Sequence, residues 1–277
     1  MALQPVDAFD PFLRQRLASS VVLVVGTLLG VLAGGWWFGA LAIAAALIMA
    51  KEWARLAADR AEPAWSLAAA AAAVPPVIAV VALMAGAGVV AVAAVLLAAP
   101  LAAGLSVVLV PGGRPDRAAG GALYVGLPVL AIVWLRNDPV GGLSHVLWLL
   151  LGVWATDIGA YLVGRSIGGP KLAPRISPGK TWSGLFGGMA GAGLLGGLAP
   201  LAAGGGSWRA AALGAVLAVV AQAGDLFESA LKRRAGVKDS GHLIPGHGGL
   251  LDRIDGLVFA APVFAGVVWL AQGSVPS

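Results

Sequence analysis

Cysteine is absent from this 277-residue chain, and charged side chains are scarce, at 11% of the residues. Without cysteine the chain has neither disulfides nor thiolate metal sites. An ordinary soluble domain carries about 25% charged residues, so 18 basic and 13 acidic side chains leave too little polar surface for a soluble protein of this length. The high apolar content excludes a disordered chain, and the lack of a Gly-X-Y period excludes collagen.

Long apolar runs take the place of the missing charge, with 59% hydrophobic residues and a mean hydropathy of +0.90. Residues 17–50 and 63–113 carry no charge, and each run holds two membrane-spanning helices of about 20 residues. Glycines at 34–35 and 86–88 are predicted to separate these helices, and the prolines at 75–76 fall inside a span. Further spans are expected at 118–135, 143–164, 183–203, 208–231 and 254–272. The sequence therefore predicts an all-α, polytopic integral membrane protein with about nine transmembrane helices.

The basic residues fall almost entirely on one side of such a bundle. With nine spans, only Arg136 and Arg209 lie on the opposite side. Because Lys and Arg in short loops favour the cytoplasmic side, we expect a cytoplasmic N-terminus and an active site facing the cytoplasm, in the cell's inner (plasma) membrane. Basic loops beside helix ends also meet anionic lipid head groups, so the net charge of +5 does not indicate a nucleic-acid partner.

Acidic residues divide the chain into two portions. Residues 1–117 place theirs in predicted tails and loops, Glu52 among them, and are interpreted as an N-terminal portion that serves packing and dimer formation. Residues 118–277 are interpreted as the catalytic portion. Three carboxylates lie there inside apolar helices, where they are costly and functional by default: Asp157, Asp225 and Glu228. The alternative for each is a structural ion pair, such as Asp157 with Arg165.

Seven glycines crowd residues 184–197. They include the pairs Gly184/Gly188, Gly187/Gly191 and Gly193/Gly197. Small residues four apart let two helices approach closely, so this segment is interpreted as a packing surface and not as a catalytic one.

Two cytoplasmic loops, 165–182 and 232–255, are expected to flank the active site. The first contains Gly179-Lys180-Thr181, but a P-loop needs glycine where Pro174 stands, and no strand is expected before it, which excludes a P-loop NTPase. A Gly-Lys-Thr turn that opens a helix still offers N–H groups, a cation and a hydroxyl to a phosphate. The alternative is a basic loop that only sets topology.

The second loop brings acid, base and glycine together. Asp225 and Glu228 share a helix face, and Asp252 and Asp255 share another where the last helix begins. Carboxylate oxygens suit Mg²⁺, and glycines around His247 permit close backbone approach to a ligand. Basic residues for phosphate follow the same stretch: Lys232, Arg233, Lys238 and Arg253. The combination indicates Mg²⁺-dependent phosphoryl or nucleotidyl transfer.

Residues 229–255 read Ser-x-Leu-Lys-Arg, four residues, Lys-Asp-x-Gly, then Pro-x-His-Gly-Gly-Leu-x-Asp-Arg-Ile-Asp. This pattern resembles the signature of the phosphatidate cytidylyltransferase (CDP-diacylglycerol synthase) family. Ser-Pro-Gly-Lys-Thr-Trp at 177–182, Gly164-Arg165 and residues 224–229 are also similar to that family, so the resemblance covers about residues 150–256 by motif. Ser183 departs from it, since many members carry an acidic or amide side chain there.

The resemblance implies that CTP and phosphatidic acid react in the bilayer to give CDP-diacylglycerol and pyrophosphate in phospholipid biosynthesis. It implies Mg²⁺ as cofactor, with Asp225, Asp252 and Asp255 as ligands; a second, monovalent ion such as K⁺ and a homodimer stay open. The implied catalytic residues are Asp225, Lys238, Asp239, His247, Asp252, Arg253 and Asp255. The implied phosphate-binding residues are Ser177, Lys180, Thr181, Lys232 and Arg233.

Two other classes of protein remain as alternatives. An ion-coupled transporter also buries carboxylates in helices, although it does not need the basic His-Gly-Gly loop. A different lipid enzyme, such as a CDP-alcohol phosphotransferase or a CTP-dependent polyprenol kinase, shares the chemistry of carboxylates and Mg²⁺, but the phosphotransferase motif Asp-Gly-x-x-Ala-Arg is missing. CTP-dependent activity that releases pyrophosphate, and not CMP or CDP, would distinguish a cytidylyltransferase from these alternatives. The roles of Asp157, Glu228 and Ser183 stay open at this point.

Overall fold

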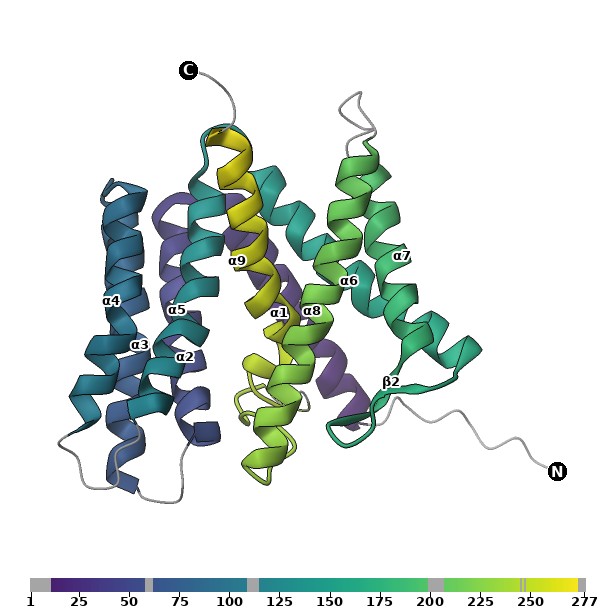
Figure 1. The fold of residues 1–277 in the computed structure, drawn as a ribbon, viewed down its shortest axis with the longest axis horizontal. Helices are drawn as coiled ribbons and strands as arrows, with labels where there is room; N and C mark the ends of the chain where they lie inside the picture. The colour runs from purple at the N-terminus through teal and green to yellow at the C-terminus, as the bar shows by residue number, and fades with distance from the viewer. Residues whose placement is uncertain are drawn as a thin grey trace.

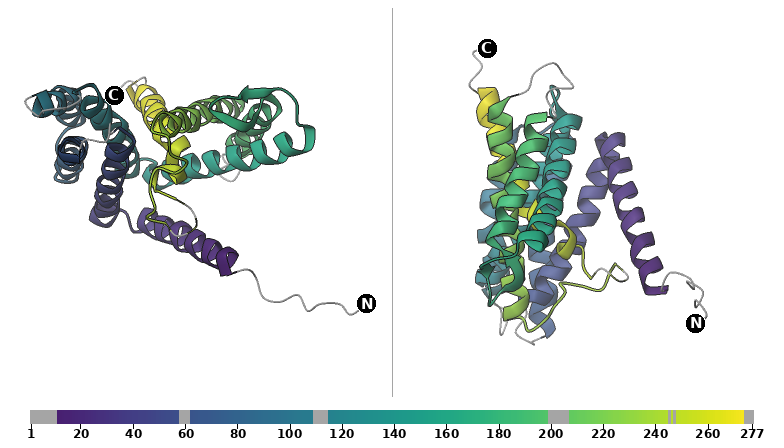
Figure 2. Two further views of the ribbon diagram at one scale, coloured as in Figure 1. Left: turned by 90° about the horizontal axis from the view of Figure 1, so that it is seen from below. Right: turned by 90° about the vertical axis from the view of Figure 1, so that its right-hand side faces the viewer.

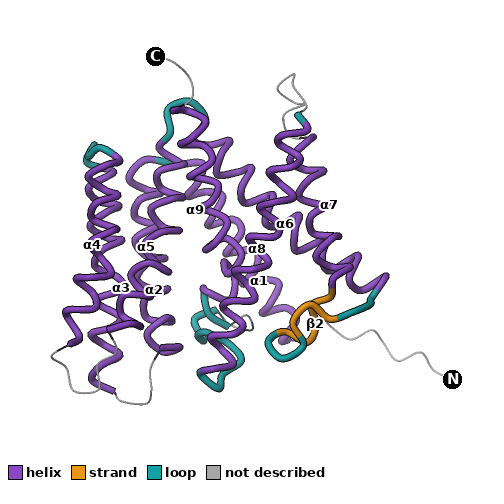
Figure 3. Tube along the Cα trace, viewed as in Figure 1, coloured by secondary structure: helices purple, strands orange, loops and turns teal. Residues whose placement is uncertain are grey.

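The computed structural model describes residues 11–57, 62–108, 115–198, 207–244, 246 and 248–273. Within these ranges the chain forms nine helices and one two-stranded hairpin (Figures 1 and 3). The elements are α1 (Pro11–Ala33), α2 (Gly35–Ala57), α3 (Glu62–Met84), α4 (Val89–Val108), α5 (Pro115–Asn137), α6 (Gly142–Ile167), β1 (Lys171–Ala173), β2 (Ser177–Thr181), α7 (Trp182–Leu198), α8 (Trp208–Arg234) and α9 (Leu251–Gly273).

The helices form two groups joined by α9. Helices α2, α3, α4 and α5 pack on one flank, and α6, α7 and α8 pack on the other, while α9 contacts both α5 and α8 (Figures 1 and 2). The hairpin, the segment between α8 and α9, and the start of α1 lie at one end of the molecule, and α9 ends at the opposite end. Polar segments far apart in the sequence therefore share one end of the bundle.

Length and composition of the helices confirm an all-α membrane protein. Five of the described helices are long and apolar enough to cross a bilayer: α2, α5, α6, α8 and α9. Two shorter apolar helical stretches, Ala18–Ala33 and Ala69–Met84, belong to α1 and α3.

The glycine turns expected between the first helices are confirmed. Gly34 and Gly35 have φ values of 63° and 50°, where a side chain would be strained, and they separate α1 from α2. Arg136 closes this corner, because its Nε donates to the Val31 carbonyl at 2.6 Å, near the end of α1. A cation there also complements the helix dipole.

The glycine-rich segment packs closely against its neighbours, as predicted. A Cβ at Gly188 would lie 3.0 Å from the Thr156 carbonyl of α6, and one at Gly191 would lie 2.7 Å from the Ala155 carbonyl. A Cβ at Gly193 would lie 3.3 Å from a carbonyl of α8. Helix α7 therefore contacts α6 and α8 backbone to backbone, which only small residues allow.

The expectation that no strand precedes Gly179-Lys180-Thr181 is wrong. Strands β1 and β2 pair antiparallel, with Lys171 opposite Thr181 and Ala173 opposite Ser177 (Figure 3). Strands of three and five residues that contain proline and glycine show no alternation of polar and apolar residues. The sequence pattern therefore did not predict them. Pro174 still excludes a P-loop.

The helices also extend further into the polar segments than hydropathy indicates. Helix α6 runs to Ile167, α8 runs to Arg234 and α9 begins at Leu251, so the connecting segments are 168–181 and 235–250 instead of 165–182 and 232–255. Basic residues in the last turn of α8 favour its C-terminal dipole. Hydropathy ends a span at the first charge, but the helix continues through it.

Candidate functional site

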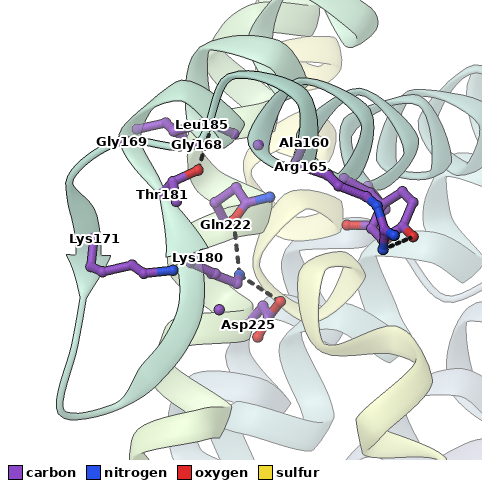
Figure 4. Close-up of a pocket in the computed structure, with 15 residues that line it drawn as sticks. Ala160, Arg165, Gly168, Gly169, Lys171, Lys180, Thr181, Leu185, Gln222 and Asp225 are labelled. Carbon is purple, nitrogen blue, oxygen red and sulfur yellow. Dashed lines mark hydrogen bonds and ion pairs between the residues drawn. The ribbon is translucent and has the colours of Figure 1, made fainter.

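A polar cavity of about 600 Å³ opens at the hairpin end, between α6, the hairpin, α7 and α8 (Figure 4). It is the place where three of the predicted site segments meet. Its lining includes two predicted residues from β2, a predicted carboxylate from α8, and polar residues from α6: Lys180, Thr181, Asp225, Asp157, Tyr161 and Arg165.

Lys180 and Asp225 form the centre of the cavity (Figure 4). The Lys180 Nζ lies 2.5 Å from Asp225 Oδ2 and donates to Gln222 Oε1 at 2.8 Å. Gln222 and Asp225 are three residues apart, so α8 presents both on one face. Gln222 was not among the residues predicted from sequence, although an amide three residues before a carboxylate in an apolar helix indicates a polar face.

Residues of α6 and β1 add charge around this pair. Arg165 Nη1 donates to the Tyr161 hydroxyl at 3.1 Å, whereas the sequence alternative paired Arg165 with Asp157. Asp157 interacts electrostatically with Asp225 and Lys180. Lys171 lies on the cavity wall and is exposed. Cations and carboxylates thus alternate around a space open to solvent, which suits a charged, phosphate-bearing ligand.

Thr181 has a structural task in addition to the predicted one. Its side chain is buried, and its Oγ1 accepts from the Gly184 N–H at 3.1 Å, which caps the first turn of α7. The Ser183 hydroxyl lies 3.0 Å from Thr181 Oγ1 and donates to the Gly168 carbonyl. Both hydroxyls therefore fix the hairpin to the ends of α6 and α7.

A second polar cluster surrounds Lys232. Its Nζ lies 2.6 Å from Asp252 Oδ1 and 3.3 Å from Glu228 Oε1, and Glu228 is fully buried. Asp252 Oδ2 accepts from the N–H groups of Ser240 and Gly249 at 2.9 and 2.8 Å, and it shares the single proton of the Ser240 hydroxyl, 2.9 Å away, with Glu52 Oε2. Lys232, predicted to bind phosphate, is thus held between two carboxylates.

Glu52 joins this cluster from the N-terminal half, contrary to its placement in a loop. It lies inside α2, is 4% exposed, and accepts hydrogen bonds from Ser240, Leu250 and Leu251. Lys51 and Arg55, which flank it, made the end of α2 resemble a polar loop. The only sequence signal was a carboxylate one turn from the end of an apolar helix.

Asp255 lies between the two clusters and interacts electrostatically with Glu228 of the second. It interacts electrostatically with Asp225, Asp157 and Lys180, and its Oδ1 accepts from the Gly256 N–H at 2.8 Å. Helices α8 and α9 meet here, since a Cβ at Gly224 would lie 2.5 Å from the Asp255 carbonyl. Asp252 and Asp255 therefore have different neighbours: Asp252 pairs with Lys232, whereas Asp255 acts on carboxylates of both clusters.

The other predicted residues lie at the surface or in the hairpin. Lys238, Asp239 and Arg253 are exposed. Arg233 is exposed as well, and its Nε donates to the Ile176 carbonyl at 3.4 Å, which links α8 to the hairpin. Ser177 begins β2, opposite Ala173. His247 lies outside the described residues.

The predicted metal ligands Asp225, Asp252 and Asp255 do not converge. Within the described ranges, no three His, Asp or Glu side chains form a group that could hold a metal ion as they stand. The donor chemistry nevertheless fits Mg²⁺ around the first cluster, because carboxylates from α6, α8 and α9 act on one another electrostatically there.

The chain is similar to known proteins over most of its length. Residues 14–271 match the model of the cytidylyltransferase family. A phosphatidate cytidylyltransferase of Brucella suis biovar 1 (strain 1330) is 42% identical over 270 residues, which cover 96% of this chain and 97% of the relative. The enzyme of that name from Pseudomonas aeruginosa is 46% identical over 168 residues, or 60% of this chain and 62% of its own. The chain belongs to the cytidylyltransferase family.

Proposed function

We propose that this chain transfers the cytidylyl group of CTP to phosphatidate and thereby forms CDP-diacylglycerol and pyrophosphate in phospholipid biosynthesis. The observation that carries the proposal is the 42% identity to a phosphatidate cytidylyltransferase over 96% of the chain. The cavity supports it, since Lys180, Arg165 and Lys171 surround a space of about 600 Å³ at one end of a membrane protein.

The reaction needs positioning and charge stabilisation more than a strong base. The phosphatidate phosphate is already an anion, so its oxygen attacks the CTP α-phosphorus in line, and the bond to the leaving pyrophosphate breaks. Lys180 is placed to neutralise phosphate charge, and its ion pair with Asp225 at 2.5 Å fixes its position. Oriented cations of this kind stabilise charge that develops in the transition state.

Mg²⁺ is part of the proposal, with Asp225 and Asp255 as ligands and Asp157 beside them. When bound, it would stabilise the triphosphate and the departing pyrophosphate. The predicted role of Asp252 as a ligand stays a prediction; its two oxygens already accept from Lys232, Ser240 and Gly249. A monovalent ion such as K⁺ is not assigned to any residue.

The topology proposed is nine spans with a cytoplasmic N-terminus, in the plasma membrane, with the cavity facing the cytoplasm. One end of the molecule holds the hairpin, segment 235–250 and the start of α1 (Figure 1). The basic residues that favour the cytoplasm gather at this end, which supports the proposed orientation. A homodimer, which the resemblance left open, stays a prediction that light scattering of the purified protein tests.

Single cysteines are expected to report this orientation, because the chain has none of its own. Val140, which is 89% exposed between α5 and α6, lies at the end opposite His242. In intact spheroplasts, an impermeant maleimide should label the Val140→Cys variant and should reach His242→Cys only after permeabilisation. The reverse pattern would refute a cytoplasmic cavity.

The activity is tested with purified protein in mixed micelles that contain phosphatidic acid, radiolabelled CTP and Mg²⁺. We expect cytidine label in the extracted lipid, an equal release of pyrophosphate, and loss of both with EDTA or when ATP replaces CTP. Release of CDP or CMP instead would indicate a kinase or a phosphotransferase. Folded protein that labels no lipid would contradict the proposal and favour the transporter.

A further inference from the structure

Glu52 in α2 holds the segment that joins α8 to α9 at two places. Its Oε2 accepts from the hydroxyl of Ser240, within the segment, at 2.9 Å. Its two oxygens accept from the Leu250 and Leu251 N–H groups at 2.8 Å each, where the segment enters α9. One side chain therefore fixes a stretch of backbone that lies almost 200 residues away in the sequence.

The backbone approaches this carboxylate so closely that side chains do not fit between them. A Cβ at Gly241 would lie 2.6 Å from Glu52 Oε1, and one at Gly249 would lie 2.6 Å from Glu52 Cδ. Real Cβ atoms essentially never come so near. The two glycines thus allow the segment to wrap around Glu52, which leaves the carboxylate 4% exposed and fully hydrogen-bonded.

The contacts continue from Glu52 to the charged residues of the family signature. The Ser240 hydroxyl lies 2.9 Å from Glu52 Oε2 and also 2.9 Å from Asp252 Oδ2. The other oxygen of Asp252 lies 2.6 Å from Lys232 Nζ. A continuous polar chain therefore runs from α2 through the segment to α9 and α8, and Asp255 follows Asp252 one turn along α9.

We propose that Glu52 is a positioning residue for cytidylyl transfer: by holding Ser240, Leu250 and Leu251 it sets the start of α9, and with it Asp252 and Asp255. Glu52 touches no residue that lines the cavity and acts through the segment. The inference rests on the proposed function for its kinetic consequence. Its structural part stands on the three hydrogen bonds alone.

The test compares Glu52→Gln, Glu52→Asp and a matched control on the same helix, the exposed Arg55→Ala. Glutamine keeps the shape, but its NH₂ group faces N–H donors and releases part of the segment. We expect faster deuterium exchange in the peptide 240–251 and a kcat lowered about 10²-fold, the cost of a displacement near 1 Å. The KM for CTP should change much less, Glu52→Asp should recover part of kcat, and Arg55→Ala should match the wild type.

Three results would overturn the inference: wild-type kcat in Glu52→Gln, unchanged exchange in 240–251, or a loss of activity that only follows the unfolded fraction. If Glu52→Gln fails to fold, Ser240→Ala carries the test, because it removes the hydroxyl between the two carboxylates and keeps the backbone bonds. A several-fold lower kcat per folded molecule then supports the inference, and an unchanged kcat overturns it. Lack of activity in the wild type would instead refute the proposed function.

Discussion

Replacing Asp225 by asparagine is expected to lower kcat by about 10³-fold and to leave the fold intact. Asp225 holds Lys180 at 2.5 Å in the cavity, and it is the carboxylate proposed first as a ligand of Mg²⁺. Asparagine keeps the shape but removes the negative charge that serves both partners. Lys180, the cation that would be left behind, is 18% exposed and keeps its hydrogen bond to Gln222 Oε1 at 2.8 Å, so the loss of charge does not leave it without a partner.

The measurement is kcat per folded molecule, with circular dichroism and size-exclusion chromatography in detergent as checks of folding. Asp138→Asn is the matched control, because it makes the same chemical change at the opposite end of the molecule, beside His145. Its activity should equal that of the wild type. If Asp225→Asn keeps more than a tenth of the wild-type kcat, Asp225 is not the centre of the site.

Replacing Asp252 by asparagine is expected to destabilise the protein as well as to reduce turnover. Its side chain is 4% exposed and pairs with Lys232, which is 12% exposed. Removing one partner of a buried ion pair costs about 3–5 kcal/mol of unfolding free energy when the other charge is left unpaired. Lys232 keeps Glu228 at 3.3 Å, so the loss should fall below that range. The new NH₂ group would also face either Lys232 or the N–H groups of Ser240 and Gly249.

Thermal unfolding in detergent, followed by circular dichroism, separates Asp252 from Asp225. The midpoint should fall markedly for Asp252→Asn and little for Asp225→Asn. The sequence alone assigned both carboxylates the same role, as metal ligands. An Asp252→Asn variant that unfolds like the wild type yet turns over no CTP would support the role predicted from sequence and contradict the structural one.

The membrane class and the glycine turns followed from composition, and the motifs selected Lys180 and Asp225 as site residues, although their ion pair came only from the structure. Uncharged runs and positive-φ glycines are local features, so the sequence displays them directly. The same holds for the α7 glycines, whose spacing indicated a packing surface and whose contacts with α6 confirm it.

The roles of residues that depend on contacts with distant parts of the chain could not be predicted from the sequence. Glu52 stands between Lys51 and Trp53, and nothing nearby indicates that it binds residues 240–251. Asp252 and Asp255 lie one turn apart, but the described backbone N–H groups of the preceding segment donate hydrogen bonds to Asp252 and not to Asp255. Lys232 looked like a phosphate ligand because its two carboxylate neighbours come from other turns or another helix.

The contact between α6 and α7 also limits how a lipid reaches the cavity. Where Gly188 and Gly191 meet the carbonyls of Thr156 and Ala155, the two helices leave no width for a hydrocarbon tail. That seam is closed to lateral diffusion of a lipid. A phosphatidate molecule from the bilayer therefore cannot enter the cavity between α6 and α7. The lipid product cannot leave between these two helices either.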